Sequence, residues 1–94
     1  MATLNYDVVT SNATLSWDYD IYFVDASGGS ITLTLPDPFD YDGTHFYIKR
    51  VDTTYSNTVT VTPTNSHIDN LTTLSINSLQ KFHFIAYNSN MYLL

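Results

Sequence analysis

The stretch DASGGSITLTLPDP, residues 25–38, contains one complete β-strand together with both of its boundaries. Ile31, Leu33 and Leu35 alternate with Thr residues, which is the period-two pattern of a strand with one buried face. The glycine pair before the strand and the Pro-Asp-Pro sequence after it are turn signals. We therefore interpret this stretch as a short strand that is isolated between two turns.

The same unit recurs along the rest of the chain, because turn signals follow one another about every ten residues. The final apolar segments, 81–87 and 91–94, flank an Asn-Ser-Asn sequence that is typical of a hairpin. This rhythm predicts an all-β fold, a small antiparallel β-sandwich or barrel of about 7–9 short strands. We expect one β-domain that covers residues 1–94.

The composition supports this fold class and excludes several functions. The chain has nine Asp but no Glu, and it has 14 Thr, eight Tyr and five Phe, which favour strands and turns over helices. The absence of Cys excludes disulfides. A net charge of −6 with only three Lys and Arg argues against nucleic acid as a partner. No apolar run approaches the roughly 20 residues of a spanning helix, so we expect no membrane insertion.

Two segments, 19–24 and 82–87, are apolar on both of their faces. A strand in a two-layer domain normally has one apolar and one polar face, so a second copy of the chain is the expected cover for the other face. The alternative is that the extra aromatic residues decorate an exposed surface. On the first interpretation, the predicted interface between chains consists of Tyr22, Val24, His83, Ile85 and Tyr87.

Several motifs in a fixed order resemble a module at the ends of bacteriophage and other viral fibre proteins. They are YDVVTSN, DIYFVDASGGSITLTLP, GTHFYIKRVD, SNTVTVTPTNSHIDN and FHFIAYNSNMYLL. Together they span nearly the whole chain. The family pattern usually has Gly where this chain has Asn70, and Trp where it has Tyr92; Asn tolerates the left-handed conformation, and Tyr keeps an aromatic anchor.

The resemblance implies a non-enzymatic structural domain at the virion surface, commonly a homotrimer, with a terminal position in a longer fibre protein. Such a domain caps a fibre or spike and presents loops to a host-surface glycan or protein receptor. The main alternative is a monomeric carbohydrate-binding β-sandwich module. We expect no catalytic residues and no cofactor, because no His is accompanied by a recognisable nucleophile motif.

Aromatic rings stack on the apolar faces of sugars, and carboxylates hold sugar hydroxyls. Residues of both kinds gather in and near the loop 37–43, which we predict to be the binding loop because binding residues concentrate in loops. The predicted binding residues are Trp17, Asp37, Phe39, Asp40, Tyr41 and Asp42. Three Asp within the loop 37–42 also suit Ca²⁺, although their spacing differs from that of an EF-hand. The simpler interpretation is that these Asp side chains form hydrogen bonds with the backbone of their own turns. We therefore predict no metal site.

Overall fold

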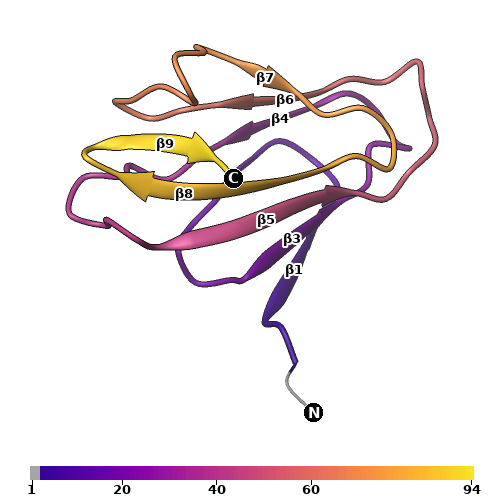
Figure 1. Ribbon diagram of the computed structural model, residues 1–94. Coiled ribbons are helices and arrows are strands. Elements are labelled where there is room, and N and C mark those ends of the chain that lie inside the picture. The colour runs from indigo at the N-terminus through magenta and orange to yellow at the C-terminus, as the bar shows by residue number, and fades with distance from the viewer. Residues whose placement is uncertain (1–2) are drawn as a thin grey trace.

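The computed structural model describes residues 3–94, and this part of the chain contains nine β-strands and no helix (Figure 1). The expected all-β class and the strand count are confirmed. The strands are β1 (Tyr6–Val9), β2 (Ala13–Thr14), β3 (Ile21–Val24), β4 (Ile31–Thr34), β5 (His45–Arg50), β6 (Val59–Thr62), β7 (Leu74–Ser75), β8 (Lys81–Tyr87) and β9 (Asn90–Leu93).

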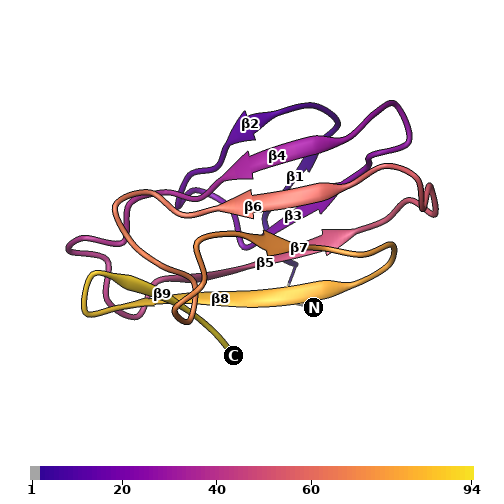
Figure 2. The ribbon, with the colours of Figure 1, turned by 90° about the horizontal axis from the view of Figure 1, so that it is seen from above.

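The strands form two sheets that lie face to face, as Figures 1 and 2 show. Sheet A has the strand order β1-β3-β5-β8-β9, and sheet B has the order β2-β4-β6-β7. The domain measures 37 × 35 × 20 Å, and its shortest dimension fits two sheets about 10 Å apart with side chains on their outer faces. No strand of residues 3–94 joins the two sheets into a closed barrel.

The prediction of purely antiparallel sheets is wrong, because both sheets are mixed. From β1 to β6 the chain alternates between the two sheets. Each time it comes back to a sheet, the new strand runs in the same direction as the last strand that was added to that sheet. Strands β1, β3 and β5 are therefore parallel, as are β2, β4 and β6. The antiparallel pairs are β6–β7, β5–β8 and β8–β9. A turn signal shows where a strand ends, but it does not specify which strand lies beside it.

This winding separates the loops into two groups at opposite ends of the molecule (Figure 2). One end carries the β2–β3, β4–β5 and β6–β7 loops and the β8–β9 turn. The other end carries the β1–β2, β3–β4, β5–β6 and β7–β8 loops. We call the first group the acidic end, because it holds six of the nine Asp residues: Asp18, Asp20, Asp37, Asp40, Asp42 and Asp69.

The core lies between the sheets and is made by alternate residues of nearly every strand. The rings of Phe46 and Phe84, which are directly opposite each other on β5 and β8, stack with their centroids 5.5 Å apart. Such aromatic cross-strand pairs stabilise sheets beyond the area that they bury. The buried apolar residues are Val9, Leu15, Tyr22, Val24, Ala26, Ile31, Leu33, Leu35, Phe46, Ile48, Val59, Val61, Ile68, Ile76, Phe84, Ala86 and Met91.

The outer faces of the two sheets differ sharply in chemistry. The outer face of sheet B carries only hydroxyl side chains, those of Thr14, Thr32, Thr34, Thr60, Thr62 and Ser75. The outer face of sheet A is mainly apolar and aromatic; its outward residues are Tyr6, Val8, Ile21, Phe23, His45, Tyr47, Lys49, Lys81, His83, Ile85, Tyr87, Asn90 and Tyr92. None of these thirteen outward side chains is acidic.

Two tight turns confirm local predictions. Asn88 and Ser89 join β8 to β9 with φ of 51° and 61°, which is the left-handed geometry that a two-residue hairpin turn requires. Asn70, where the viral pattern usually has Gly, has φ of 89°. Asn adopts such angles more readily than most residues, so it serves here in place of Gly.

The pattern of burial predicts how stability responds to two neighbouring substitutions in β4. Leu33 is fully buried, so Leu33→Ala should lower the free energy of unfolding by about 2–5 kcal/mol. Thr32 points outward from sheet B, so Thr32→Ala should cost no more than about 1 kcal/mol, the span of strand propensities. Urea denaturation of both variants measures this difference, and equal losses would contradict the assignment of faces.

Candidate functional site

A stacked pair of aromatic residues organises the acidic end. The rings of Trp17, in the β2–β3 loop, and Tyr41, in the β4–β5 loop, are nearly parallel, with centroids 5.0 Å apart and an angle of 18°. Trp17 also packs edge-on against Phe46, at a centroid distance of 5.6 Å. Because Phe46 belongs to the core, this chain of three rings anchors the β2–β3 and β4–β5 loops to sheet A.

A groove of about 430 Å³ opens beside this stack. It is lined by Leu15, Ser16, Trp17, Asp18, Pro36, Asp37 and Tyr41. Tyr41 remains 45% exposed, so part of its side chain is accessible to a ligand. Aromatic rings beside two carboxylates, in a concave site, match the usual anatomy of a small polar ligand site. The arrangement suits a sugar, whose apolar face stacks on a ring while its hydroxyls donate to carboxylate oxygens.

The structure brings three of the six predicted binding residues to this groove: Trp17, Asp37 and Tyr41. Asp37 also shapes its own loop, because its carboxylate accepts hydrogen bonds from the Asn65 side chain and the Phe39 backbone N–H, both at 3.0 Å. These two bonds, the Asn65 contact foremost, lower the pKa of Asp37. Asp37 therefore stays ionised and can still face a ligand.

The other three predicted binding residues lie outside the groove. Phe39 is 63% exposed on the same loop and does not line the groove. Asp40 and Asp42 border a separate hollow next to the β8–β9 turn, where the Asp42 carboxylate accepts a hydrogen bond from the Asn88 N–H at 2.9 Å. Asp42 thus holds the turn, and Asp40 has the left-handed φ of 64° at the tip of its loop.

The loop 37–42 does not gather a set of metal ligands. Within residues 3–94, no three side chains of His, Asp, Glu or Cys converge closely enough to hold an ion. The reason is visible in the hydrogen bonds, since Asp37 and Asp42 point toward different neighbours, Asn65 and Asn88.

The predicted interface residues divide between the two faces of sheet A. His83, Ile85 and Tyr87 point outward from β8, as expected. Tyr22 and Val24 point into the core and are 2% and 0% exposed, so the prediction is wrong for these two residues. Both faces of β3 are apolar, and its sequence alone does not reveal which one faces the core.

The outward residues of β3 are Ile21 and Phe23. The hydroxyl of Tyr22 explains its inward position, because it finds a partner at the rim of the core. It donates a hydrogen bond to the Ser16 carbonyl at 2.8 Å and accepts one from the Ser16 N–H at 2.9 Å. A buried Tyr needs such a partner for its hydroxyl.

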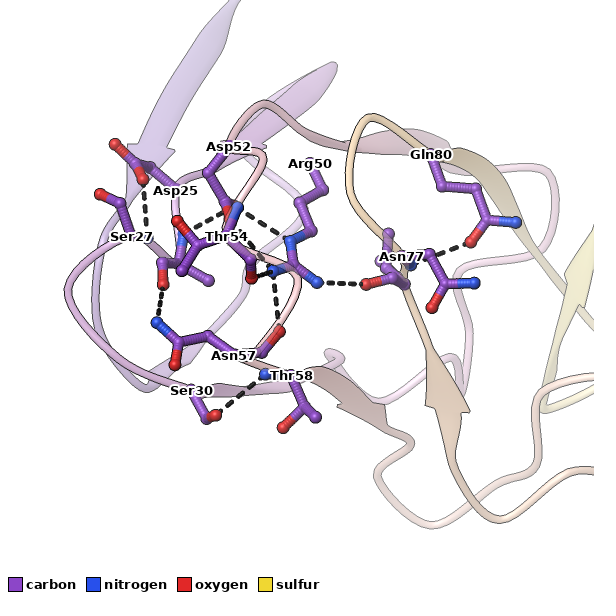
Figure 3. A network of polar contacts seen from close by, with 12 residues as sticks. Asp25, Ser27, Ser30, Arg50, Asp52, Thr54, Asn57, Thr58, Asn77 and Gln80 are labelled. Atoms are coloured by element: carbon purple, nitrogen blue, oxygen red, sulfur yellow. Dashed lines mark hydrogen bonds and ion pairs between the residues drawn. The ribbon is translucent and has the colours of Figure 1, made fainter.

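The end opposite the acidic end contains a buried ion pair that sequence reasoning missed (Figure 3). The Arg50 guanidinium donates two hydrogen bonds to the Asp52 carboxylate, both at 3.0 Å. It also donates to the backbone carbonyls of Thr54, Asn57 and Ile76. These bonds engage all three guanidinium nitrogens, so we assign the pair a structural role that ties the β5–β6 and β7–β8 loops together.

The Asp52 carboxylate completes this network. It accepts hydrogen bonds from the backbone N–H groups of Ala26 and Thr54, at 2.8 and 3.0 Å. The hydrogen bonds from Arg50 are the main reason that the pKa of Asp52 lies far below its usual range, and they outweigh the effect of burial. The alternation of residues along β5 could have revealed that Arg50 is buried, because it places Arg50 on the same inward face as Phe46 and Ile48.

A scan against protein-family models and a search of curated proteins find no match for this chain. Within residues 3–94, no helix is long and apolar enough to cross a membrane.

The ion pair predicts a pH-dependent stability. Asp52→Asn should lower the free energy of unfolding at pH 7 by about 3–5 kcal/mol, because it leaves the Arg50 guanidinium buried without a counter-charge. The folded-state pKa of Asp52 is lowered, so the pair stabilises the fold above the unfolded pKa of about 3.9 and loses that effect as the pH falls toward the folded value. The deficit of the variant should therefore shrink as the pH is lowered.

Urea denaturation from pH 7 to about pH 2 measures this deficit. Asp25→Asn is the matched control, since Asp25 is only partly buried and its carboxylate accepts a hydrogen bond from Ser27 in its own turn, without a cationic partner. A deficit of Asp52→Asn that stays constant across the pH range would contradict the role of the ionised pair.

Proposed function

We propose that this chain is a non-enzymatic structural domain of a viral fibre or other virion-surface appendage, which assembles as a homotrimer and presents a receptor-binding end. The observation that carries the proposal is the difference between the two outer faces. Sheet B exposes hydroxyl groups, which water solvates, whereas the outer face of sheet A is mainly aromatic and aliphatic. Large exposed apolar patches of this kind mark surfaces for association.

Two parts of the outer face of sheet A, the edge strand β1 and the last residue of β8, are especially exposed in the single chain. Tyr6 and Val8 on β1 are 59% and 53% exposed, and Tyr87 on β8 is 61% exposed. Contact with neighbouring copies would remove these side chains from water, at a gain of about 25 cal/mol per Å² of apolar area. A chain of 94 residues without disulfides benefits from such a shared core.

The charge distribution also favours contact at this face. Chains with a net charge of −6 repel one another, and a contact between copies is least costly where no carboxylate is buried. The thirteen outward side chains of sheet A include no Asp, whereas both Lys residues of the chain, Lys49 and Lys81, lie on this face. Assembly through sheet A would leave the acidic end free.

The acidic end is the proposed receptor-binding surface, and the groove beside Trp17 and Tyr41 is its binding site. Six Asp residues surround this end, and neither Lys lies there. Such a potential repels anionic sugars. The favoured ligand is therefore a neutral glycan, or a protein surface without excess negative charge. The same groove also fits the alternative function, a monomeric carbohydrate-binding module, and the mass of the particle in solution distinguishes the two.

Light scattering coupled to size-exclusion chromatography should give a particle of three times the 10.6 kDa chain. Val8→Asp, which places a carboxylate on the outer face of sheet A, should yield single chains, because the contact would bury an unpaired charge. Thr32→Asp is the matched control, since it adds the same group to the outer face of sheet B, and it should leave the trimer intact. A wild-type chain that elutes alone would refute the trimer and favour the monomeric module.

Glycan binding tests the groove separately. On an array that contains neutral and sialylated glycans, we expect binding to neutral glycans. Trp17→Ala and Tyr41→Ala should each reduce it by at least tenfold, because each removes a ring of the groove. Phe39→Ala is the control, since Phe39 is exposed on the same loop but lies outside the groove. An equal loss in all three variants would argue against the groove as the site.

A further inference from the structure

Two histidines meet on the outer face of sheet A. His45 on β5 and His83 on β8 are diagonal neighbours, since His83 pairs directly with Tyr47 and His45 pairs with Ile85. His45 Nδ1 and His83 Nε2 are 2.9 Å apart. Diagonal side chains on one face of an antiparallel pair lie within reach of each other, and here the two ring nitrogens face each other across a hydrogen bond.

The surrounding side chains hold the His83 ring in place. Tyr47 stacks on it with the centroids 4.0 Å apart and the planes at 16°, and Lys81 Nζ lies 5.5 Å from the centre of the Tyr47 ring. The His45 ring approaches edge-on, at 65° to the His83 ring. The two nitrogens are therefore positioned by packing, which reduces the ordering that a ligand would have to impose.

We propose that His45 and His83 form a two-imidazole site for a divalent transition metal, with Cu²⁺ and Ni²⁺ preferred over Zn²⁺. A neutral imidazole has one nitrogen with a free lone pair, and a change of tautomer in the ring that donates the hydrogen bond frees the lone pair of its facing nitrogen as well. Both ligands then bind one ion, in place of the proton that they share without it. Water supplies the remaining ligands, because none of the outward side chains of this face is acidic.

The separation of the nitrogens accounts for the metal preference. Two nitrogens at about 2.0 Å from one metal lie about 2.8 Å apart at the roughly 90° angle of a tetragonal site, and about 3.3 Å apart at the tetrahedral angle. The observed 2.9 Å, which is the length of the hydrogen bond between the two imidazoles, is closer to the tetragonal than to the tetrahedral separation, so Cu²⁺ or Ni²⁺ requires less movement of the two side chains. The general affinity order of divalent metals also places Cu²⁺ above Ni²⁺ and Zn²⁺.

The ionisation of His83 supports its role as a ligand. Burial is the main cause that lowers the pKa of His83, and the nearby charges of His45 and Lys81 act in the same direction. The neutral form of His83, which is the form that binds metals, is therefore favoured more than in an ordinary histidine. Both ligands come from one chain, and the proposal requires that the contact between copies through sheet A leaves this pair open to solvent.

Titration calorimetry at pH 7.5 with Cu²⁺, Ni²⁺ and Zn²⁺ tests the site. The wild-type chain should bind one Cu²⁺ per chain at this pair, with affinity decreasing from Cu²⁺ to Ni²⁺ to Zn²⁺. His45→Gln and His83→Gln should each weaken Cu²⁺ binding by at least the 10–100-fold that is typical of losing a supporting group at a metal site. The control is His67→Gln, because His67 lies in the β6–β7 loop, outside this pair, and it should bind Cu²⁺ like the wild type.

Thermal unfolding provides a second measurement that needs no calorimetric signal. Cu²⁺ should raise the melting temperature of the wild type and of His67→Gln, because the folded state alone presents the paired ligands. It should leave His45→Gln and His83→Gln unchanged. The proposal is overturned if Cu²⁺ does not bind the wild type, or if it binds both pair variants as tightly as the wild type.

Discussion

The alternation of the chain between two sheets is the constraint on which the rest of the structure depends. Because every loop up to β6 crosses from one sheet to the other, strands of one sheet arrive in the same direction and pair in parallel. A parallel pair normally needs a long crossover connection, and here a strand of the opposite sheet serves as that crossover. The shared core between the sheets is what holds each crossover in place.

This winding also sorts the chemistry of the chain in space. It collects residues from loops that are far apart in the sequence, such as Trp17 and Tyr41, at one end of the molecule. It places the Arg50–Asp52 pair at the other end, where one guanidinium ties the loops together. The two ends therefore have different roles: one is fixed by a saturated ion pair, and the other exposes rings and carboxylates around a groove.

Sequence reasoning succeeded where the signal is local. Alternation identified the strand at Ile31–Thr34, and the Asn-Ser-Asn sequence identified the closing hairpin, because both depend on residues that are adjacent along the chain. It failed where partners are distant. Tyr22 and Val24 were assigned to the outer face, because a strand with two apolar faces does not indicate which one meets the core. The predicted antiparallel direction of strand pairing was wrong because it also depends on which distant strands become neighbours.

The sequence by itself determined that the chain is all-β, where most strands begin and end, and that some strands are apolar on both sides. These properties follow from side-chain chemistry at short spacing. Only the tertiary structure decided that the sheets are mixed, that Trp17 and Tyr41 share one groove, and that His45 and His83 meet across β5 and β8. Each of these depends on which distant segments pair, and that choice is made by the packing of the whole core.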